Sequence, residues 1–331
     1  MAYIVTTFKK AIFFSCFLFI GISKSDMVPF INIYVHGTQQ WWLKTILNPW
    51  TWYSPEGICS VKDLSDNSAI KQDALRIHRI DPLNFNIDHY YTFGWPGNLS
   101  LDVRKESGKK LYEETKALLQ SYKIKYGRYP HVRFVGFSHG GNVVLHALEY
   151  LPFFEEKVVL EAVLLVSPVQ KITAPYLNSP YLDSSYVICT EYDLIQKLDF
   201  YNYQGKYYFS GQFFENAPKN CTQAVLEINN KTLDHTDFMH SCMMHIPMIL
   251  KHTKSLDSKI PFKINSEIDK KNYQSFDVLR INVQDPGFIY SALLYLGYSL
   301  YGKRNDTYGY KSIKKNNFHY DWLNLKLFYV H

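Results

Sequence analysis

A glycine-rich turn near the middle of the chain joins an apolar strand to a helix. Residues 131–135 predict the strand, residues 136–141 (GFSHGG) the turn, and residues 142–151 the helix. Cβ atoms at positions 136 and 140 would clash with the neighbouring strand or helix, so the glycines permit this tight path. We expect Ser138 to have a strained backbone. Its hydroxyl should be exposed at the N-terminus of the helix, where the helix dipole favours negative charge.

The rest of the chain alternates strand and helix patterns in the same way. Runs that are apolar throughout are typical of strands buried on both faces of a parallel sheet, and helices are indicated by apolar residues at helical spacing. The sequence therefore predicts an α/β fold, with a mostly parallel central sheet and helices on both faces. The predicted strands are 30–35, 89–93, 158–166, 186–190 and the last core strand 224–228, and the predicted helices are 104–123 and 238–250.

Two segments fall outside this alternation. Residues 38–88 show no clear period and contain four tryptophans, which predicts an irregular, lid-like insertion. Its tryptophans either line an apolar pocket or pack over the sheet. Residues 255–331 predict a C-terminal extension packed on the main domain (residues 27–254), with a strand over 276–283 and a helix over 288–300.

The N-terminus has the pattern of an export signal. Lys9 and Lys10 precede an apolar run over residues 11–22, and polar residues follow at once. This order predicts a secretory signal peptide over residues 1–26, so the chain is expected to be periplasmic or secreted. The run is shorter than the ~20 residues of a spanning helix, and an uncleaved segment would instead anchor the protein to the membrane.

The cysteines fit an exported chain. Without Cys16, which lies in the apolar run, an even number remains, and four cysteines permit two disulfides. A plain buried thiol is an equal expectation for Cys189, which lies in a predicted buried strand. The four cysteines are Cys59, Cys189, Cys221 and Cys242.

Composition excludes two classes of protein. Hydrophobic residues make up 47% of the chain, which excludes global disorder. The net charge is only +6, and the lysines occur as scattered pairs rather than as a basic stripe, so nucleic-acid binding is not indicated. The 27 Tyr and 22 Phe allow contact with a lipid surface, although half-buried positions account for such residues as well.

Acidic and histidine residues follow two of the predicted strands. Asp193 comes three residues after the strand that ends at position 190, with Glu191 and Asp199 as competitors. His235 comes after the strand over 224–228, and His240 is the alternative.

These residues resemble the α/β-hydrolase superfamily, and within it the lipase and esterase group. The resemblance covers about residues 30–250 and rests on the turn at Ser138, on the order Ser138, Asp193, His235, and on His36-Gly37-Thr38 after the first strand. It implies the α/β-hydrolase fold, with Ser138 as nucleophile, His235 as base and Asp193 as the acid that orients the base.

The resemblance also implies an oxyanion hole. The backbone N–H groups of Thr38 and His139 would hold the developing negative charge, and the Thr38 hydroxyl or Gln39 would add a third donor. Lipases often carry Leu or Met where this chain has His139, but that position contributes its backbone. His36, His131 and His146 are expected to be structural.

The implied activity is hydrolysis of small-molecule carboxylic esters, including lipid-like acyl esters, through an acyl-enzyme. It needs no cofactor and no metal, and His235, His240 and His245 are spaced five apart, unlike a helical zinc pair. Peptidase and acyltransferase activities use the same residues. A different class is a hydrolase-fold protein without turnover, which binds a ligand or attaches to the envelope.

Overall fold

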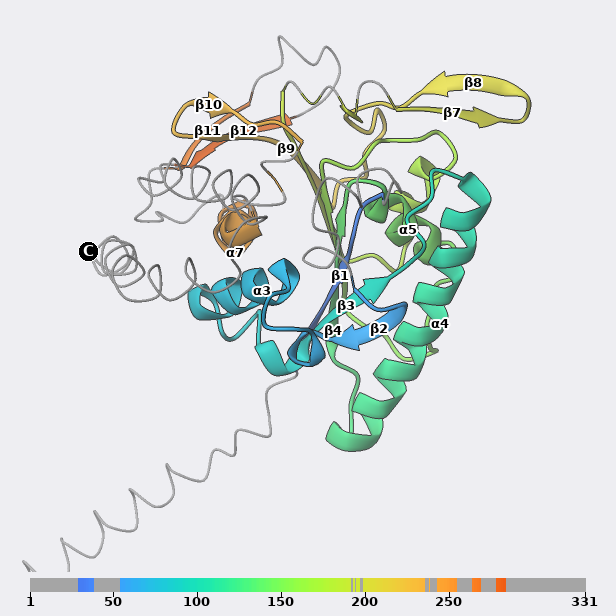
Figure 1. The fold of residues 1–331 in the computed structure, drawn as a ribbon, viewed down its shortest axis with the longest axis vertical. Coiled ribbons are helices and arrows are strands. Elements are labelled where there is room, and N and C mark those ends of the chain that lie inside the picture. The colour runs from blue at the N-terminus through green and yellow to red at the C-terminus, as the bar shows by residue number, and fades with distance from the viewer. Residues whose placement is uncertain are drawn as a thin grey trace, which may run out of the picture.

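A mostly parallel sheet forms the centre of the protein (Figure 1). The computed structural model describes residues 29–38, 54–191, 193, 195–196, 199–235, 238, 243–254, 264–268 and 278–283. Within them the strand order is β11-β12-β9-β6-β5-β4-β1-β3-β2, with β10 paired to β9. The strands are β1 (Phe30–Val35), β2 (Gly57–Ser60), β3 (Tyr90–Gly94), β4 (His131–Phe137), β5 (Leu160–Leu165), β6 (Ser184–Cys189), β9 (Cys221–Ile228), β10 (Lys231–Thr232), β11 (Ile264–Ile268) and β12 (Val278–Val283).

The parallel strands run from β3 through β1, β4, β5, β6 and β9 to β12. β2, β10 and β11 pair antiparallel with their neighbours and lie at the margins of the sheet. The middle strands are mostly apolar and almost wholly buried, as is typical of parallel strands covered on both faces. Asn32 in β1 and Glu161 in β5 are buried polar exceptions. The predicted α/β fold with a mostly parallel sheet is confirmed.

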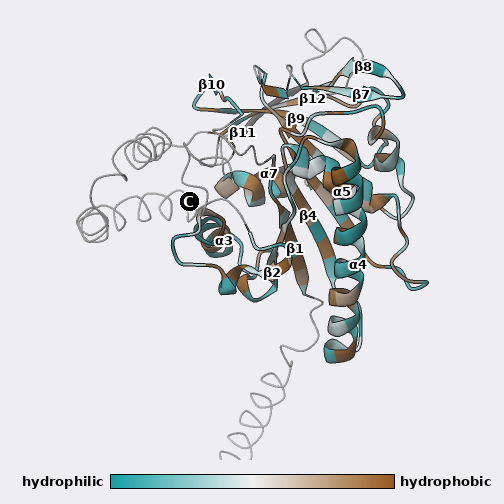
Figure 2. Ribbon diagram, turned by 45° about the vertical axis from the view of Figure 1, so that its right-hand side comes forward, coloured by the Kyte–Doolittle hydropathy of each residue, from teal (hydrophilic) through white to brown (hydrophobic). Residues whose placement is uncertain are grey.

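Helices cover the two faces of the sheet. α3 (Ala69–Ile80) and α7 (Ile246–Lys254) lie on one face, and α4 (Leu101–Tyr126) and α5 (His139–Leu148) lie on the other (Figure 1). Each face has its own apolar core, and Figure 2 shows the hydrophobic residues gathered along the strands and the inner helix faces. Short 3₁₀ turns complete the description: Val61–Asp63, Ile87–His89, Ala174–Asn178 and Met243–His245.

Local sequence explains the long helix α4. The Ser100 side chain accepts the backbone N–H of Val103 at its start, and Gly127 ends it with φ 74°. Gly108 allows α4 to approach α5, because a Cβ at this position would lie 2.4 Å from the Cβ of His146. The close approach buries the inner face of α4 against the helix that begins at the glycine-rich turn.

The prediction of an irregular stretch over residues 38–88 is wrong for its second half. That half contains β2 and the helix α3, which Ser68 caps through the N–H of Lys71. Ile70, Ala74 and Ile77 are buried at helical spacing, but the charged residues between them obscure the short apolar stripe. Residues 39–53, with the four tryptophans of the expected lid, lie outside the described residues.

Two expectations near the C-terminus also differ from the structure. β9 is not the last core strand, because β12 pairs with it in parallel and β11 follows antiparallel. The predicted strand over 276–283 is confirmed as β12, whereas the predicted helix over 288–300 lies outside the described residues. The helix expected over 238–250 begins later, as α7 at Ile246, after a 3₁₀ turn that contains His245.

Three described cysteines, Cys59, Cys189 and Cys221, carry free thiols. Cys242 and the expected signal peptide lie outside the described residues. Across the part of the chain that the structure describes, no helix combines the length and the apolar character of a membrane span.

Candidate active site

The turn between β4 and α5 holds Ser138 in an unusual conformation. Its φ is 51° and its ψ is −132°, values that a residue with a Cβ rarely adopts. Glycines make the turn compact: a Cβ on Gly136 would lie 2.6 Å from the Cα of Gly141, and one on Gly140 would lie 2.3 Å from the Val35 carbonyl oxygen. The expected clash with neighbouring backbone is therefore present at both glycines.

The Ser138 side chain does not cap the helix that it precedes. Ser60, Ser68 and Ser100 stand at the same position of other helices, and each accepts a backbone N–H. A serine that starts a helix without capping it keeps its hydroxyl available for other chemistry.

Ser138 is buried, with 6% of its surface exposed, and this corrects the expectation of an exposed hydroxyl. The reason is the loop after β1, which packs directly on the turn. A Cβ on Gly37 would lie 2.9 Å from the Cβ of Ser138 and 3.0 Å from the ring of Phe137. Only a glycine allows this loop to lie against the serine.

His36 holds that loop to the end of β3. The backbone N–H of Trp95 donates to Nε2 of His36 (3.2 Å), and the Trp95 indole N–H donates to the His36 carbonyl (2.7 Å). Since Nε2 accepts, Nδ1 carries the proton and donates to the Gly37 carbonyl at 2.8 Å. His36 is thus structural in the sense expected, and it orients the segment next to Ser138.

The Thr38 hydroxyl is buried and has no hydrogen-bond partner among the described residues. A buried hydroxyl without a partner costs stability, so such groups call for an explanation. Thr38 directly follows the glycine that touches Ser138, so the unsatisfied hydroxyl belongs to the segment that borders the turn. Gln39, the other candidate donor, lies outside the described residues.

Asp193 and His235 come together at the carboxyl edge of the sheet. Nδ1 of His235 lies 2.6 Å from Oδ2 of Asp193, and both residues are buried. The carboxylate can only accept, so Nδ1 carries the proton and Nε2 is the basic nitrogen of the neutral ring. The second oxygen, Oδ1, accepts the backbone N–H of Gln196 at 2.8 Å.

His235 also lies beside the turn that carries Ser138. Its ring is 5.3 Å from the ring of Phe137, measured between centroids. The structure therefore brings the predicted base and acid to each other and to the residue before Ser138. His240, the alternative base, lies outside the described residues.

A second histidine–carboxylate pair lies next to the first, and sequence reasoning did not find it. Nε2 of His139 donates to Oδ1 of Asp199 at 3.0 Å, while Oδ2 of Asp199 accepts from Gln170 (3.1 Å) and Ser210 (2.5 Å). Asp199, a competitor for the acid in the sequence, thus contacts the residue after Ser138 and not His235. Residues 60 positions apart leave no local pattern that would reveal such a contact.

The charge state of this second pair follows from its surroundings. Burial raises the pKa of Asp199, but hydrogen bonds from His139, Ser210 and Gln170 outweigh it and lower the pKa to about 2. Burial lowers the pKa of His139, which the Asp199 hydrogen bond only partly opposes. At neutral pH the pair is a carboxylate bonded to a neutral imidazole, and it ties the start of α5 to the segment after β6.

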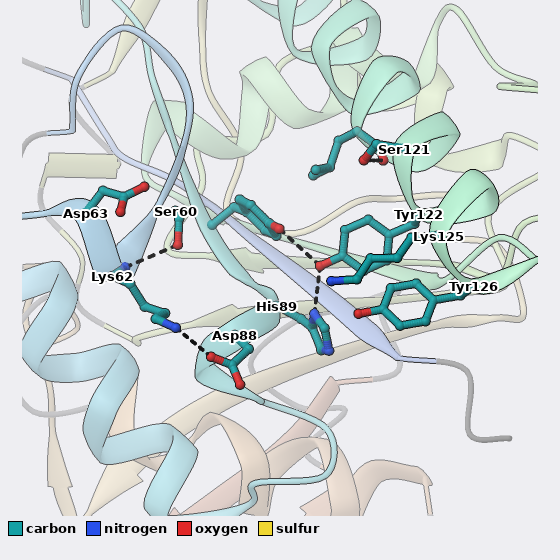
Figure 3. Close-up of a pocket in the computed structure, with 11 residues that line it drawn as sticks. Ser60, Lys62, Asp63, Asp88, His89, Ser121, Tyr122, Lys125 and Tyr126 are labelled. Atoms are coloured by element: carbon teal, nitrogen blue, oxygen red, sulfur yellow. Dashed lines mark hydrogen bonds and ion pairs between the residues drawn. The ribbon is translucent and has the colours of Figure 1, made fainter. Parts of the chain in front are cut away.

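An open pocket of about 620 Å³ lies elsewhere (Figure 3). Its polar groups pair with one another: Lys62 with Asp88 at 2.8 Å, and His89 with the hydroxyl of Tyr122 at 2.7 Å. It surrounds the amino end of β3, whereas Ser138 follows the carboxyl end of the parallel strand β4. The pocket therefore lies at the opposite edge of the sheet and holds none of the predicted site residues.

The other histidines expected to be structural lie away from this edge. The ring of His131 packs edge-on against Phe30, with centroids 4.9 Å apart. His146 is buried between α4 and α5.

Comparisons with known proteins give little more. No protein-family model matches the chain, and no curated protein matches it. Among solved structures, a lipase-esterase related protein from Clostridium acetobutylicum ATCC 824 aligns with 13% identity and a TM-score of 0.23. The match covers 48% of this chain and 52% of that chain, so it spans about half the length of either.

Proposed function

We propose that this protein is a serine hydrolase of the α/β-hydrolase fold that cleaves carboxylic esters, with Ser138 as nucleophile, His235 as base and Asp193 as the orienting acid. One observation carries the proposal: the buried 2.6 Å contact between Nδ1 of His235 and Asp193, beside the strained turn at Ser138. A carboxylate that fixes the tautomer of a histidine next to an uncapped serine is the arrangement that activates a hydroxyl.

The first half of the reaction forms an acyl-enzyme. Nε2 of His235 takes the Ser138 proton as Oγ attacks the ester carbonyl carbon. The tetrahedral intermediate then collapses, its bond to the alcohol oxygen breaks, and the imidazolium returns the proton to the leaving alkoxide. Asp193 stays ionised throughout and stabilises the imidazolium.

The second half is hydrolysis of that acyl-enzyme. Water attacks the acyl carbon while His235 takes a proton from it, and the bond to Ser138 breaks as the proton passes to Oγ. The products are a carboxylic acid and the regenerated serine. The step uses the same groups and needs no cofactor.

Two backbone N–H groups form the oxyanion hole in this mechanism, those of Thr38 and His139. The contact of Gly37 with Ser138 supports this role, because it holds the preceding loop against the nucleophile. The unpartnered hydroxyl of Thr38 is suited to donate a third hydrogen bond to the oxyanion. Losing one such donor costs about 10²–10³ in rate.

The substrate class is an ester with a hydrophobic acyl chain. The apolar residues that pack with Phe137, whose ring lies 5.3 Å from that of His235 between centroids, favour this class. The pattern of residues 1–26 favours export, so the substrate would be met outside the cytoplasm.

A fluorophosphonate probe tests the proposal directly, since it reacts only with an activated serine. The wild-type protein should be labelled, whereas Ser138→Ala should not be, and His235→Ala should react at least about 10³-fold more slowly. His89→Gln is the matched control, because this histidine lines the pocket at the opposite edge. It should react like the wild type.

Other results would redirect the assignment. Labelling that persists in His235→Ala but is lost in His240→Ala would make His240 the base. A folded wild-type protein that is never labelled would refute the hydrolase and favour a binding role. A series of p-nitrophenyl esters of increasing chain length, set against peptide substrates and alcohol acceptors, separates the esterase from a peptidase or an acyltransferase.

A further inference from the structure

The side chain of His139 is anchored at both of its ring nitrogens. Nε2 donates to the Asp199 carboxylate at 3.0 Å, so Nδ1 is the accepting nitrogen of the neutral ring. Nδ1 faces the side-chain amide nitrogen of Asn142 at 3.4 Å, and both His139 and Asn142 are buried. A carboxylate on one side and an amide N–H on the other leave room for one tautomer of the imidazole.

The Asn142 anchor is itself held in place. Its amide nitrogen donates to the carbonyl of Pro168 at 2.9 Å, and its amide oxygen accepts the hydroxyl of Thr173 at 2.7 Å. A carbonyl can only accept, so the Pro168 contact fixes which end of the amide carries the hydrogens. The second hydrogen of the same nitrogen is then the one that faces His139.

The Asp199 anchor lies at the base of a hairpin formed by β7 (Phe200–Tyr203) and β8 (Lys206–Phe209) (Figure 1). The backbone N–H of Ser210, which follows β8, donates to the Asp199 carbonyl at 2.9 Å. The Ser210 hydroxyl and the Gln170 amide both donate to Oδ2 of Asp199. The other carboxylate oxygen is thereby directed at His139.

The charge of Asp199 acts on a second group. Arg104 lies on α4 and is 1% exposed; its Nη1 donates to the Leu99 carbonyl at 2.9 Å, and its buried Nε has no partner among the described residues. Burial lowers the pKa of Arg104 to about 10, and the negative charge of Asp199 opposes this. Asp199 is therefore the counter-charge of a buried guanidinium as well as the partner of His139.

These anchors act on the peptide unit that joins Ser138 to His139. Ser138 has a strained backbone, and such a conformation persists only where the surrounding structure holds it. The carbonyl of this peptide unit accepts the backbone N–H of Gly141 at 2.9 Å. In a trans peptide the N–H points away from the carbonyl. His139 is the first residue of α5, so its N–H has no partner within the helix and points out of its start.

We propose that His139 is a positioning residue through its side chain: the hydrogen bonds to Asp199 and Asn142 hold the strained turn and so fix the direction of the His139 backbone N–H. The inference rests on the proposed function, in which this N–H is one of the oxyanion donors. Without the anchors the peptide unit can rotate as the strain at Ser138 relaxes. The donor would then be misdirected in the transition state, whereas binding of the ester in the ground state would not change.

The test replaces the imidazole by a side chain of similar size without hydrogen bonds. His139→Leu should lower kcat for a soluble ester about tenfold with KM unchanged, because the N–H is misdirected but still present. The inhibition constant of a trifluoromethyl ketone, which forms an oxyanion when the serine adds to it, should rise by the same factor. A change at Asp199 would be less specific, since it would also remove the counter-charge of Arg104.

His139→Gln tests whether the hydrogen bond itself is what matters. The amide nitrogen of glutamine can take the place of Nε2 and donate to Asp199. This variant should recover most of the kcat that His139→Leu loses. Equal losses in both variants would mean that ring packing, and not the hydrogen bond, supports the turn, and would overturn the proposal.

His146→Leu is the matched control. His146 is a buried histidine on the same helix, and neither of its ring nitrogens has a hydrogen-bond partner among the described residues. At pH 8 this variant should keep the kcat and the ketone affinity of the wild type. A loss of kcat equal to that of His139→Leu would show a general effect on α5 and would contradict the proposal.

A measurement without turnover tests the anchors themselves. Isotope labelling of the histidines in the Ser138→Ala protein lets NMR report the tautomer and charge of the His139 ring, with His139→Gln to assign its signals. Burial lowers the pKa of His139 below its usual 6.5, so the ring should be neutral and protonated on Nε2 at pH 7. A proton on Nδ1 instead would refute the arrangement of the anchors.

The outcomes keep this inference apart from the proposed function. A wild-type protein that reacts with the fluorophosphonate, together with an unchanged kcat in His139→Leu, would reject the positioning role alone. A folded wild-type protein that shows the Nε2–H tautomer but is never labelled would reject the hydrolase, and with it the role of His139 in catalysis.

Discussion

Asp73 is expected to make the stability of this protein depend on pH. The residue lies on α3 with 6% of its surface exposed, facing the sheet close to the hydroxyl-bearing rings of Tyr34 and Tyr90. Burial raises the pKa of Asp73 to about 7, although Nη1 of Arg76 lies 3.1 Å from the carboxylate. The same carboxylate contributes to the raised pKa of both tyrosines, after burial itself.

The size and sign of the effect follow from linkage. A pKa that rises from 3.8 to about 7 on folding corresponds to about 4 kcal/mol. Between these values the folded state holds a proton that the unfolded state has released. The contribution of Asp73 to the free energy of unfolding is therefore fully present below pH 3.8 and is lost as the pH rises through 7.

Asp73→Asn removes this titration. At pH 4 the variant and the wild type should unfold at similar free energies. At pH 8 the variant should be more stable by about 4 kcal/mol, because the pKa of about 7 already includes the opposing effect of Arg76. Urea unfolding followed by circular dichroism at pH 4, 5.5 and 8 measures the difference, with the exposed residue change Glu106→Gln on α4 as control. A difference between variant and wild type that is the same at pH 4 and pH 8 would refute the reasoning.

Three further predictions concern other buried residues of the protein. Burial lowers the pKa of His146 to about 4, so the stability that the neutral ring contributes is lost as the pH falls from 6.5 toward 4. Relative to the wild type, the free energy of unfolding of His146→Leu in urea should be about 3 kcal/mol more favourable at pH 4 than at pH 8. A difference from the wild type that is the same at both pH values would contradict this. Asp199→Asn should loosen the hold on His139 and lower kcat for a soluble ester about tenfold, with KM little changed; an unchanged kcat would show that the pair does not position the site. Gly37→Ala should lower kcat by about 10², because its Cβ would press on Ser138; a normal kcat in a folded variant would exclude the close approach described above.

The fold could be anticipated where one local pattern decides the outcome. β1 was predicted residue for residue, and β4 to within two residues, because strands buried on both faces are mostly apolar. α3 was not predicted because its apolar stripe is short and interrupted by charged residues. The place of β12 beside β9 was not predicted because strand order depends on contacts between distant segments of the chain.

The candidate site could likewise be predicted only in part. Asp193 and His235 could be proposed as partners because their places after two predicted strands, in the order Ser138, Asp193, His235, resemble the α/β-hydrolase pattern. The contact of His139 with Asp199 could not be, since it joins two side chains on unrelated elements. The burial of Ser138 was also missed, because it depends on the loop after β1 packing over the turn, and a sequence carries no direct signal of such a contact.

The parallel pairing of β12 with β9 has a consequence for how the chain is made. β9 leads to His235, and one of its edges is covered only when residues 278–283 have been synthesised, about fifty positions later. Until then that edge exposes unpaired N–H and C=O groups of an apolar strand, which favours pairing with other chains. A protein truncated at residue 254 should therefore aggregate during folding, even though it contains Ser138, Asp193 and His235.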